Sequence, residues 1–147
     1  MAKVDVTGGD FAGTLEQIEI QMRATGLAKA ARAGGNEVAK DARKRAPRGN
    51  PSHKPEKKPL HKTIGTVIRE YANGVVMAVV GPKYPEGAHG HLVEEGHEIV
   101  TKGPEKRRTG LFAKIKKFLA PAGDTTQVQQ RNAVYNSLRK TIKEAGG

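Results

Sequence analysis

The chain of 147 residues contains no cysteine, no tryptophan and only two serines. The lack of cysteine excludes a disulfide framework, a cysteine-ligated zinc site and a thiol nucleophile, and it is consistent with synthesis in a cytosol. No run of about 18 apolar residues occurs, so we expect no membrane-spanning helix and no membrane partner. The first residues lack the apolar stretch of a signal peptide.

Large apolar side chains are also scarce. Val, Ile, Leu and Phe together number 29 of the 147 residues, which is close to the composition of disordered chains. The core is therefore expected to be thin for this length, and parts of the chain should order only against partners. The length indicates one domain, which we predict over residues 14–147, preceded by an N-terminal arm over residues 1–13.

Positive charge is abundant and concentrated in two segments. The formal net charge is +11; residues 40–62 carry nine basic and two acidic side chains, and residues 102–117 carry seven and one. Such blocks are typical of contact with a polyanion or an acidic protein surface, although they are also found as solvated loops. Few aromatic residues accompany them, so contact with DNA would involve the phosphate backbone without sequence preference. The residues predicted to contact DNA or a partner are Arg43, Lys44, Arg45, Arg48, Lys54, Lys57, Lys58, Lys106, Arg107 and Arg108.

The N-terminal half predicts a long helix followed by an extended loop. Thr14 and Gln17 form a capping box, and apolar and small residues then recur at helical spacing to about residue 45. Gly26 interrupts the pattern, and Gly34-Gly35 weakens it. The alanine-rich stripe suits close packing against a sheet or a neighbouring subunit. Four prolines within residues 47–59 predict a flexible, basic loop.

A β-hairpin is predicted next. Residues 63–71 are rich in β-branched side chains, residues 75–80 form a continuous apolar run, and Asn73-Gly74 lies between them. Because the second strand is apolar on both faces, we expect it to be central and covered on both sides.

The remaining sequence predicts a loop and two helices. Leu92 and Val93 should anchor their segment to the core, and residues 98–110 should form a long loop. Apolar residues in 111–119 follow a helical spacing, so we predict a helix there. Ala120-Pro121-Ala122 should end this helix. Asp124 should cap a last helix, with Val128, Tyr135, Leu138 and Ile142 on one face. The order of elements indicates an α+β fold: a long N-terminal helix, a sheet based on an antiparallel hairpin, and a C-terminal helix.

The sequence offers little support for catalysis. His89, His91 and His97 lie near Glu94, Glu95 and Glu98 and could hold zinc, but their spacing matches no strong metal-binding pattern. Adjacent Glu94 and Glu95 would point to opposite faces of a strand and could not easily form an acid–base pair. Neither a Gly-x-Ser-x-Gly nor a phosphate-binding loop motif occurs. We therefore predict no enzyme activity, no catalytic or metal-ligating residue and no cofactor.

Several short segments occur in an order that resembles a known family. These segments are Ala39–Pro47, Pro59–Ile64, Val79–Gly81, His91–His97 and Phe118–Ala122. Together they resemble the tail-completion, or tail-component, family of tailed phages, whose role is similar to that of lambda minor tail protein Z. Glu95 stands where the family usually has an aromatic residue. The motif residues carried over as structural are Pro47, Leu60, Gly81, Leu92, Val93, Glu94, Gly96, Phe118, Leu119 and Pro121.

The resemblance implies a structural protein of the virion, made in the cytoplasm of the bacterial host. Family members look like α+β subunits that form a homo-oligomeric ring, expected to be a hexamer, at the head–tail junction or neck. The neighbouring proteins would be the head-closure protein and the tail terminator, and the genome would pass through the ring. Two alternatives remain open from the residues alone: a stand-alone basic DNA-binding protein, and a metal-dependent enzyme built on the three histidines.

Overall fold

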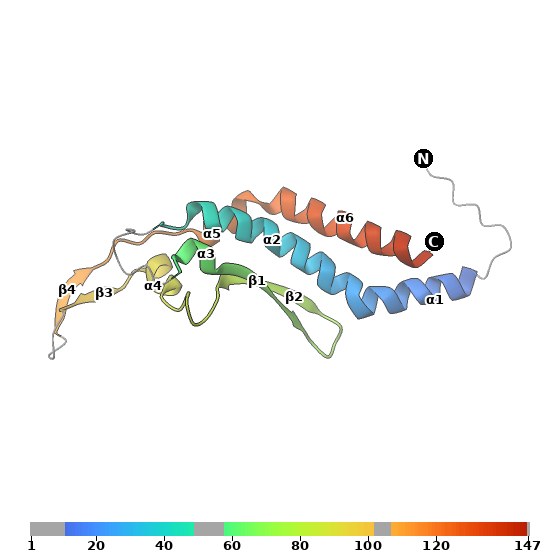
Figure 1. Cartoon of the computed structure of the whole chain (residues 1–147), viewed down its shortest axis with the longest axis horizontal. Coiled ribbons are helices and arrows are strands. Elements are labelled where there is room, and N and C mark those ends of the chain that lie inside the picture. Colours follow the sequence, from blue (N-terminus) through green and yellow to red (C-terminus); the bar gives the residue numbers. More distant parts are fainter. Residues whose placement is uncertain (1–10, 49–57, 102–106, 147) are drawn as a thin grey trace.

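The computed structural model describes residues 11–48, 58–101 and 107–146. It shows an elongated α+β molecule, which confirms the predicted fold class (Figure 1). The helices are α1 (Phe11–Gln21), a π-helical segment η1 (Met22–Gly26), α2 (Leu27–Arg45), α3 (Leu60–Thr63), α4 (Gly90–Glu95), α5 (Leu119–Thr125) and α6 (Gln127–Gly146). The strands are β1 (Ile64–Glu70), β2 (Val76–Pro82), β3 (Glu98–Val100) and β4 (Arg108–Phe112).

Helix α2 is the centre of the molecule. It packs against α6 on one side and against the β1–β2 hairpin on the other. Two adjacent glycines make both contacts close: a Cβ on Gly34 would lie 2.8 Å from Val134 Cγ2 of α6, and one on Gly35 would lie 2.6 Å from Thr66 Cγ2 of β1. The Gly34-Gly35 pair therefore serves packing on two faces, where the sequence pattern alone suggests only a weakened helix.

The predicted helix over residues 14–45 is largely confirmed, but its start is wrong. Helix α1 begins at Phe11, so Thr14 lies inside the helix and does not cap it, and the last three residues of the predicted arm are helical. Residues 1–10 lie outside the described part of the chain. The predicted interruption at Gly26 corresponds to η1, which joins α1 to α2 at a bend.

The predicted hairpin is confirmed, with one correction. Strands β1 and β2 pair in antiparallel register from Ile64↔Pro82 to Glu70↔Val76, and Gly74 has a positive φ of 79° in the connecting turn. The expectation that the second strand is central and covered on both faces is wrong. The sheet has two strands, α2 covers one face, and Val67, Met77 and Val79 on the other face are exposed.

The predicted loop at 98–110 and helix at 111–119 are also wrong. Strands β3 and β4 form a second antiparallel hairpin, and the chain after it has no regular structure until Leu119. Backbone hydrogen bonds from Ala113 N to His97 O and from Lys116 N to Val93 O hold this segment beside α4. Tertiary pairing therefore overrides the helical spacing of its apolar residues.

Two further corrections concern the C-terminal region. Pro121 does not end a helix: it lies in the first turn of α5, where its missing N–H costs nothing. The last helix begins at Gln127, so Asp124 belongs to α5 and does not cap α6. Of the four apolar residues predicted on one face of that helix, three are exposed: Val128, Tyr135 and Ile142.

The core is small and rich in alanine. Its buried members are Ala39, Ala42, Ala46, Leu60, Ile64, Phe118 and Ala122. Val93, predicted as an anchor, packs against this cluster together with Val38, Val80 and Leu119. Because the buried side chains come mostly from alanine, the expectation of a thin core is confirmed.

Candidate functional site

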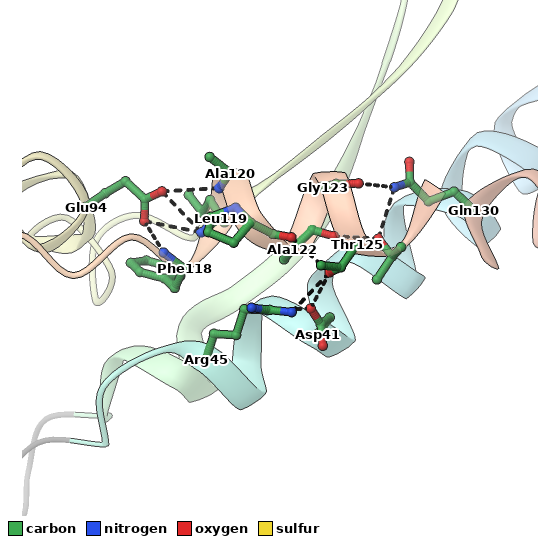
Figure 2. A network of polar contacts seen from close by, with 12 residues as sticks. Asp41, Arg45, Glu94, Phe118, Leu119, Ala120, Ala122, Gly123, Thr125 and Gln130 are labelled. Carbon is green, nitrogen blue, oxygen red and sulfur yellow. Dashed lines mark hydrogen bonds and ion pairs between the residues drawn. The ribbon is translucent and has the colours of Figure 1, made fainter. Parts of the chain in front are cut away.

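Five of the ten residues that the resemblance singled out gather near one end of α2. Leu60 and Phe118 are buried in the core, and Val93 and Leu119 pack against it. Glu94 lies beside them on α4 and points toward the start of α5 (Figure 2). We call this region the motif cluster: Leu60, Val93, Glu94, Phe118 and Leu119.

Glu94 closes the N-terminus of α5. Its Oε2 accepts a hydrogen bond from Phe118 N at 2.8 Å. Leu119 N donates to both carboxylate oxygens and Ala120 N donates to Oε1, each at 3.2 Å. The first N–H groups of a helix have no partner within the helix, and a negative charge there also interacts favourably with the helix dipole. A carboxylate from α4 therefore orders the start of α5 and holds Phe118 in the core.

A second set of polar contacts, between three side chains, connects α2 to the other end of α5. Arg45 Nε donates to Asp41 Oδ2 at 2.6 Å, and Arg45 Nη2 donates to Thr125 Oγ1 at 3.1 Å. Thr125 Oγ1 also lies 3.1 Å from Asp41 Oδ2. The hydrogen bond from Arg45 is the main cause that lowers the pKa of Asp41 from its ordinary value of 3.8.

Four other residues of these segments lie in a turn or are half-buried. Gly96 ends α4 with a positive φ of 80°, and a Cβ there would lie 2.9 Å from Ile115 Cγ1. Pro47 follows α2 and Gly81 lies near the end of β2, both half-buried. Leu92, also half-buried, accepts a 3.3 Å contact from His97 Nδ1 at its carbonyl oxygen.

The predicted basic contact residues differ in their availability. Arg43 donates through Nε and Nη2 to the carbonyl oxygen of Ile64, at 3.0 and 2.8 Å, and Arg45 is bonded as described above. Both side chains therefore support the packing of α2. Lys44 and Arg48 are exposed.

The other basic candidates lie in or beside segments outside the described residues. Lys58 pairs with Glu86 at 3.1 Å, which lowers the pKa of the Glu86 carboxyl. Arg107 is exposed, and Arg108 Nε lies 3.6 Å from Glu98 Oε2. Lys54, Lys57 and Lys106 fall in ranges 49–57 and 102–106, which the structure does not describe.

The structure also reveals exposed apolar residues that the sequence did not single out as a site. All five residues of β4 are exposed, including Leu111 at 64% and Phe112 at 74%. Ile99 and Val100 of β3 are exposed as well. Their signal in the sequence was the apolar content of 111–119, which we interpreted as one face of a helix.

Within the described ranges, no three His, Asp or Glu side chains come close enough together to hold a metal ion. None of the helices in the described part of the chain has the length and apolar character needed to cross a membrane.

Comparison with known proteins identifies one family. The family model described as "Bacteriophage HK97-gp10, putative tail-component" matches residues 9–96, more than half of the chain. The match covers α1 to α4 and ends just after Glu94, so it includes the residue that caps α5. No curated protein and no solved structure matches the chain.

Proposed function

The chain belongs to the HK97-gp10 family of bacteriophage tail components, and from this premise we propose that it is a single-domain subunit of a ring at the head–tail junction. In this role the protein completes the tail for joining to the filled head, and the genome passes through the ring. Six subunits are the proposed number. The role is structural, without a catalytic step or a cofactor.

The observation that carries this proposal is the exposure of apolar side chains on an elongated subunit with a small core. Strand β4 has no buried residue among its five described positions, and Val67, Met77 and Val79 are exposed on β1–β2. An isolated two-stranded hairpin is marginally stable in water, and large exposed apolar patches mark interaction surfaces. Contacts with neighbouring subunits and with the adjoining neck and tail proteins would cover these residues.

Measurement of the oligomeric state tests the proposal. Native mass spectrometry of the purified protein, alone and with purified tails, should give a closed ring or a subunit that joins tails as a ring. A protein that remains monomeric and does not join tails would contradict it.

The basic segments are proposed to face the genome or an acidic surface of an adjacent ring. Replacing Lys54, Lys57 and Lys58 with Glu should then reduce the yield of infectious particles. A matched variant replaces Lys29, Lys140 and Lys143, which lie on helices, with Glu. It should reduce the yield of infectious particles less. Equal yields from both variants and the wild type would rule out a role for this segment.

DNA binding by the isolated chain is the second candidate function, supported by the net charge of +11. It requires binding to duplex DNA whose affinity falls steeply with salt. Because Arg43 and Arg45 are engaged in hydrogen bonds within the molecule, fewer cations of the first segment are free for phosphate contacts. Native mass spectrometry of the purified protein with duplex DNA in place of tails distinguishes the two functions.

A further inference from the structure

The solvent-facing side of helix α2 has an unusual composition. The helix runs between α6 and the β1–β2 hairpin (Figure 1), and its buried residues pack against both. Its exposed residues are, in chain order, Lys29, Arg32, Asn36, Lys40, Arg43, Lys44 and Arg45. Six of these seven residues are basic and one is an amide, so the exposed side of α2 presents neither an acidic nor an apolar side chain.

Two of these cations are engaged within the molecule. Arg43 donates to the carbonyl oxygen of Ile64, and Arg45 donates to Asp41 and Thr125. The other exposed residues follow one another at intervals of three or four positions, which places them on the same side of the helix. We call them the α2 cationic face: Lys29, Arg32, Asn36, Lys40 and Lys44. At a rise of 1.5 Å per residue, this face is about 22 Å long.

Few carboxylates oppose the charge of this face. Helix α2 itself contains two: Asp41 pairs with Arg45 at 2.6 Å, and Glu37 is half-buried. Three of the elements with the main contacts to α2 carry one acidic residue each: Glu70 of β1, Asp124 of α5 and Glu144 of α6, which pairs with Lys140 at 3.7 Å. Among the described residues, no ion pair involves any of the four cations of the α2 cationic face.

The composition of this face favours phosphate groups over a protein surface. Protein–protein contacts centre on apolar and aromatic side chains, and no large apolar side chain of α2 is exposed. The other long helix differs, because α6 exposes Val128, Tyr135 and Ile142 beside its basic residues. Contacts with the backbone of DNA come instead from Lys, Arg and polar side chains such as Asn, which donate to phosphate oxygens. Those are the side chains that the α2 cationic face presents.

We propose that the α2 cationic face binds the phosphate backbone of duplex DNA. Its residues Lys29, Arg32, Asn36 and Lys40 are absent from the basic residues that the sequence predicted as contacts. Four cations in one copy provide few phosphate contacts, so a single chain should hold DNA only at low salt. In the ring proposed above, on which this last step rests, several copies would turn this face to the genome and bind it together at higher salt.

The salt dependence of DNA binding by the purified full chain tests the proposal. Fluorescence anisotropy with a short duplex gives the slope of log K against log salt, to which each phosphate contact contributes about 0.9. Changing three residues of the face to Gln should reduce that slope by about 2.7: Lys29→Gln, Arg32→Gln and Lys40→Gln. The matched control makes the same change in net charge on α6 and should alter the slope by less than about 1: Arg139→Gln, Lys140→Gln and Lys143→Gln. Equal reductions from both triple variants, or no binding by the wild type at about 50 mM salt, would overturn the proposal.

Joining to purified tails, measured on the same proteins, separates this inference from the proposed function. An α2 variant that joins tails with the reduced slope supports both. A wild type that binds DNA through α2 and never joins tails supports the inference and contradicts the ring. An α2 variant that keeps the wild-type slope and fails to join tails identifies the face as a protein interface, which overturns the inference and leaves the ring intact. Circular dichroism checks that the variants are folded, as expected for exposed helical positions changed to Gln.

Discussion

Glu94 and Phe118 are 24 positions apart in the sequence, and the Glu94 carboxylate accepts a 2.8 Å hydrogen bond from the Phe118 amide. This bond joins α4 to the N-terminus of α5 and fixes the backbone of the one phenylalanine that is fully buried. Two of the segments that carry the resemblance therefore meet in the fold: His91–His97 supplies the helix cap, and Phe118–Ala122 supplies the start of the helix that is capped.

Removal of this cap should lower stability. Glu94→Ala leaves up to three backbone N–H groups of α5 without their acceptor, so we expect a loss of about 1–3 kcal/mol in the free energy of unfolding. Glu94→Gln keeps an acceptor oxygen and should lose less. Urea denaturation followed by circular dichroism measures both. The exposed neighbour provides the control: Glu95→Ala should stay within about 0.5 kcal/mol of the wild type, and an equal loss from both alanine variants would contradict the cap.

Substitution of a helical glycine should have opposite effects at two positions. Gly35→Ala places a methyl group 2.6 Å from Thr66 Cγ2 and 3.1 Å from Ala78 Cβ, so α2 and the hairpin must separate, at a cost of about 1–3 kcal/mol. Gly123→Ala, on α5, has no heavy atom within 4 Å of the new methyl group and should stabilise by up to about 1 kcal/mol. Thermal denaturation compares them, and stabilisation by both changes would show that the contact at Gly35 is loose.

Phe112 of β4 and Phe118 at the start of α5 should respond differently to truncation. Phe118 is fully buried, and Phe118→Ala should cost about 3–5 kcal/mol of unfolding free energy. Phe112 is 74% exposed, so Phe112→Ala should leave the stability of the monomer almost unchanged and weaken self-association. Denaturation at low protein concentration isolates the first effect, and analytical ultracentrifugation measures the second. Association unaffected by Phe112→Ala would remove this side chain from the interface.

The contact between α2 and α5 should depend on acid pH. Asp41 has a lower pKa in the folded chain than its ordinary value of 3.8, so the unfolded state binds more protons between those two values. The stabilisation is therefore complete above about pH 5 and is lost as the pH falls through 3.8 and then the lowered pKa.

Asp41→Asn tests this dependence. The difference in unfolding free energy between wild type and variant should be constant above about pH 5 and shrink below about pH 4. Asp124→Asn, at an exposed position on α5, is the matched control. A difference for Asp41→Asn that grows on acidification would contradict the assigned hydrogen bonds.

Local signals predicted part of this fold well. The β1–β2 hairpin was predictable because Asn73-Gly74 between two β-branched runs determines a turn within a few residues. The long helix was predictable from its spacing, although its start was not, because the capping box at Thr14 lies inside a helix that begins three residues earlier. Residues 111–119 were wrongly predicted because their apolar spacing fits a helix, while Leu111 and Phe112 pair in β4 and backbone hydrogen bonds to His97 and Val93 hold the residues that follow.

The candidate site was less accessible from the sequence. Glu94, which accepts the first N–H groups of α5, lies 24 or more positions before them in the sequence. Arg45 and Thr125 are 80 positions apart. Composition gives no information on such partners. The apolar run of β2 predicted burial on both faces, but among the described residues only α2 covers the hairpin, and Val67, Met77 and Val79 on its other face are exposed.

The π-helical segment η1 determines the rotational phase of α1. The N–H of Leu27 bonds to the carbonyl oxygen of Met22, five residues earlier, which amounts to one extra residue in a helix that turns about 100° per residue. Deleting one residue from Met22–Gly26 would restore ordinary α-helical bonding and rotate α1 by about 100° relative to α2. Phe11 and Leu15 would then face a different side of the molecule with no change in their chemistry, so the direction in which the exposed apolar side chains of α1 point is set by a single inserted residue.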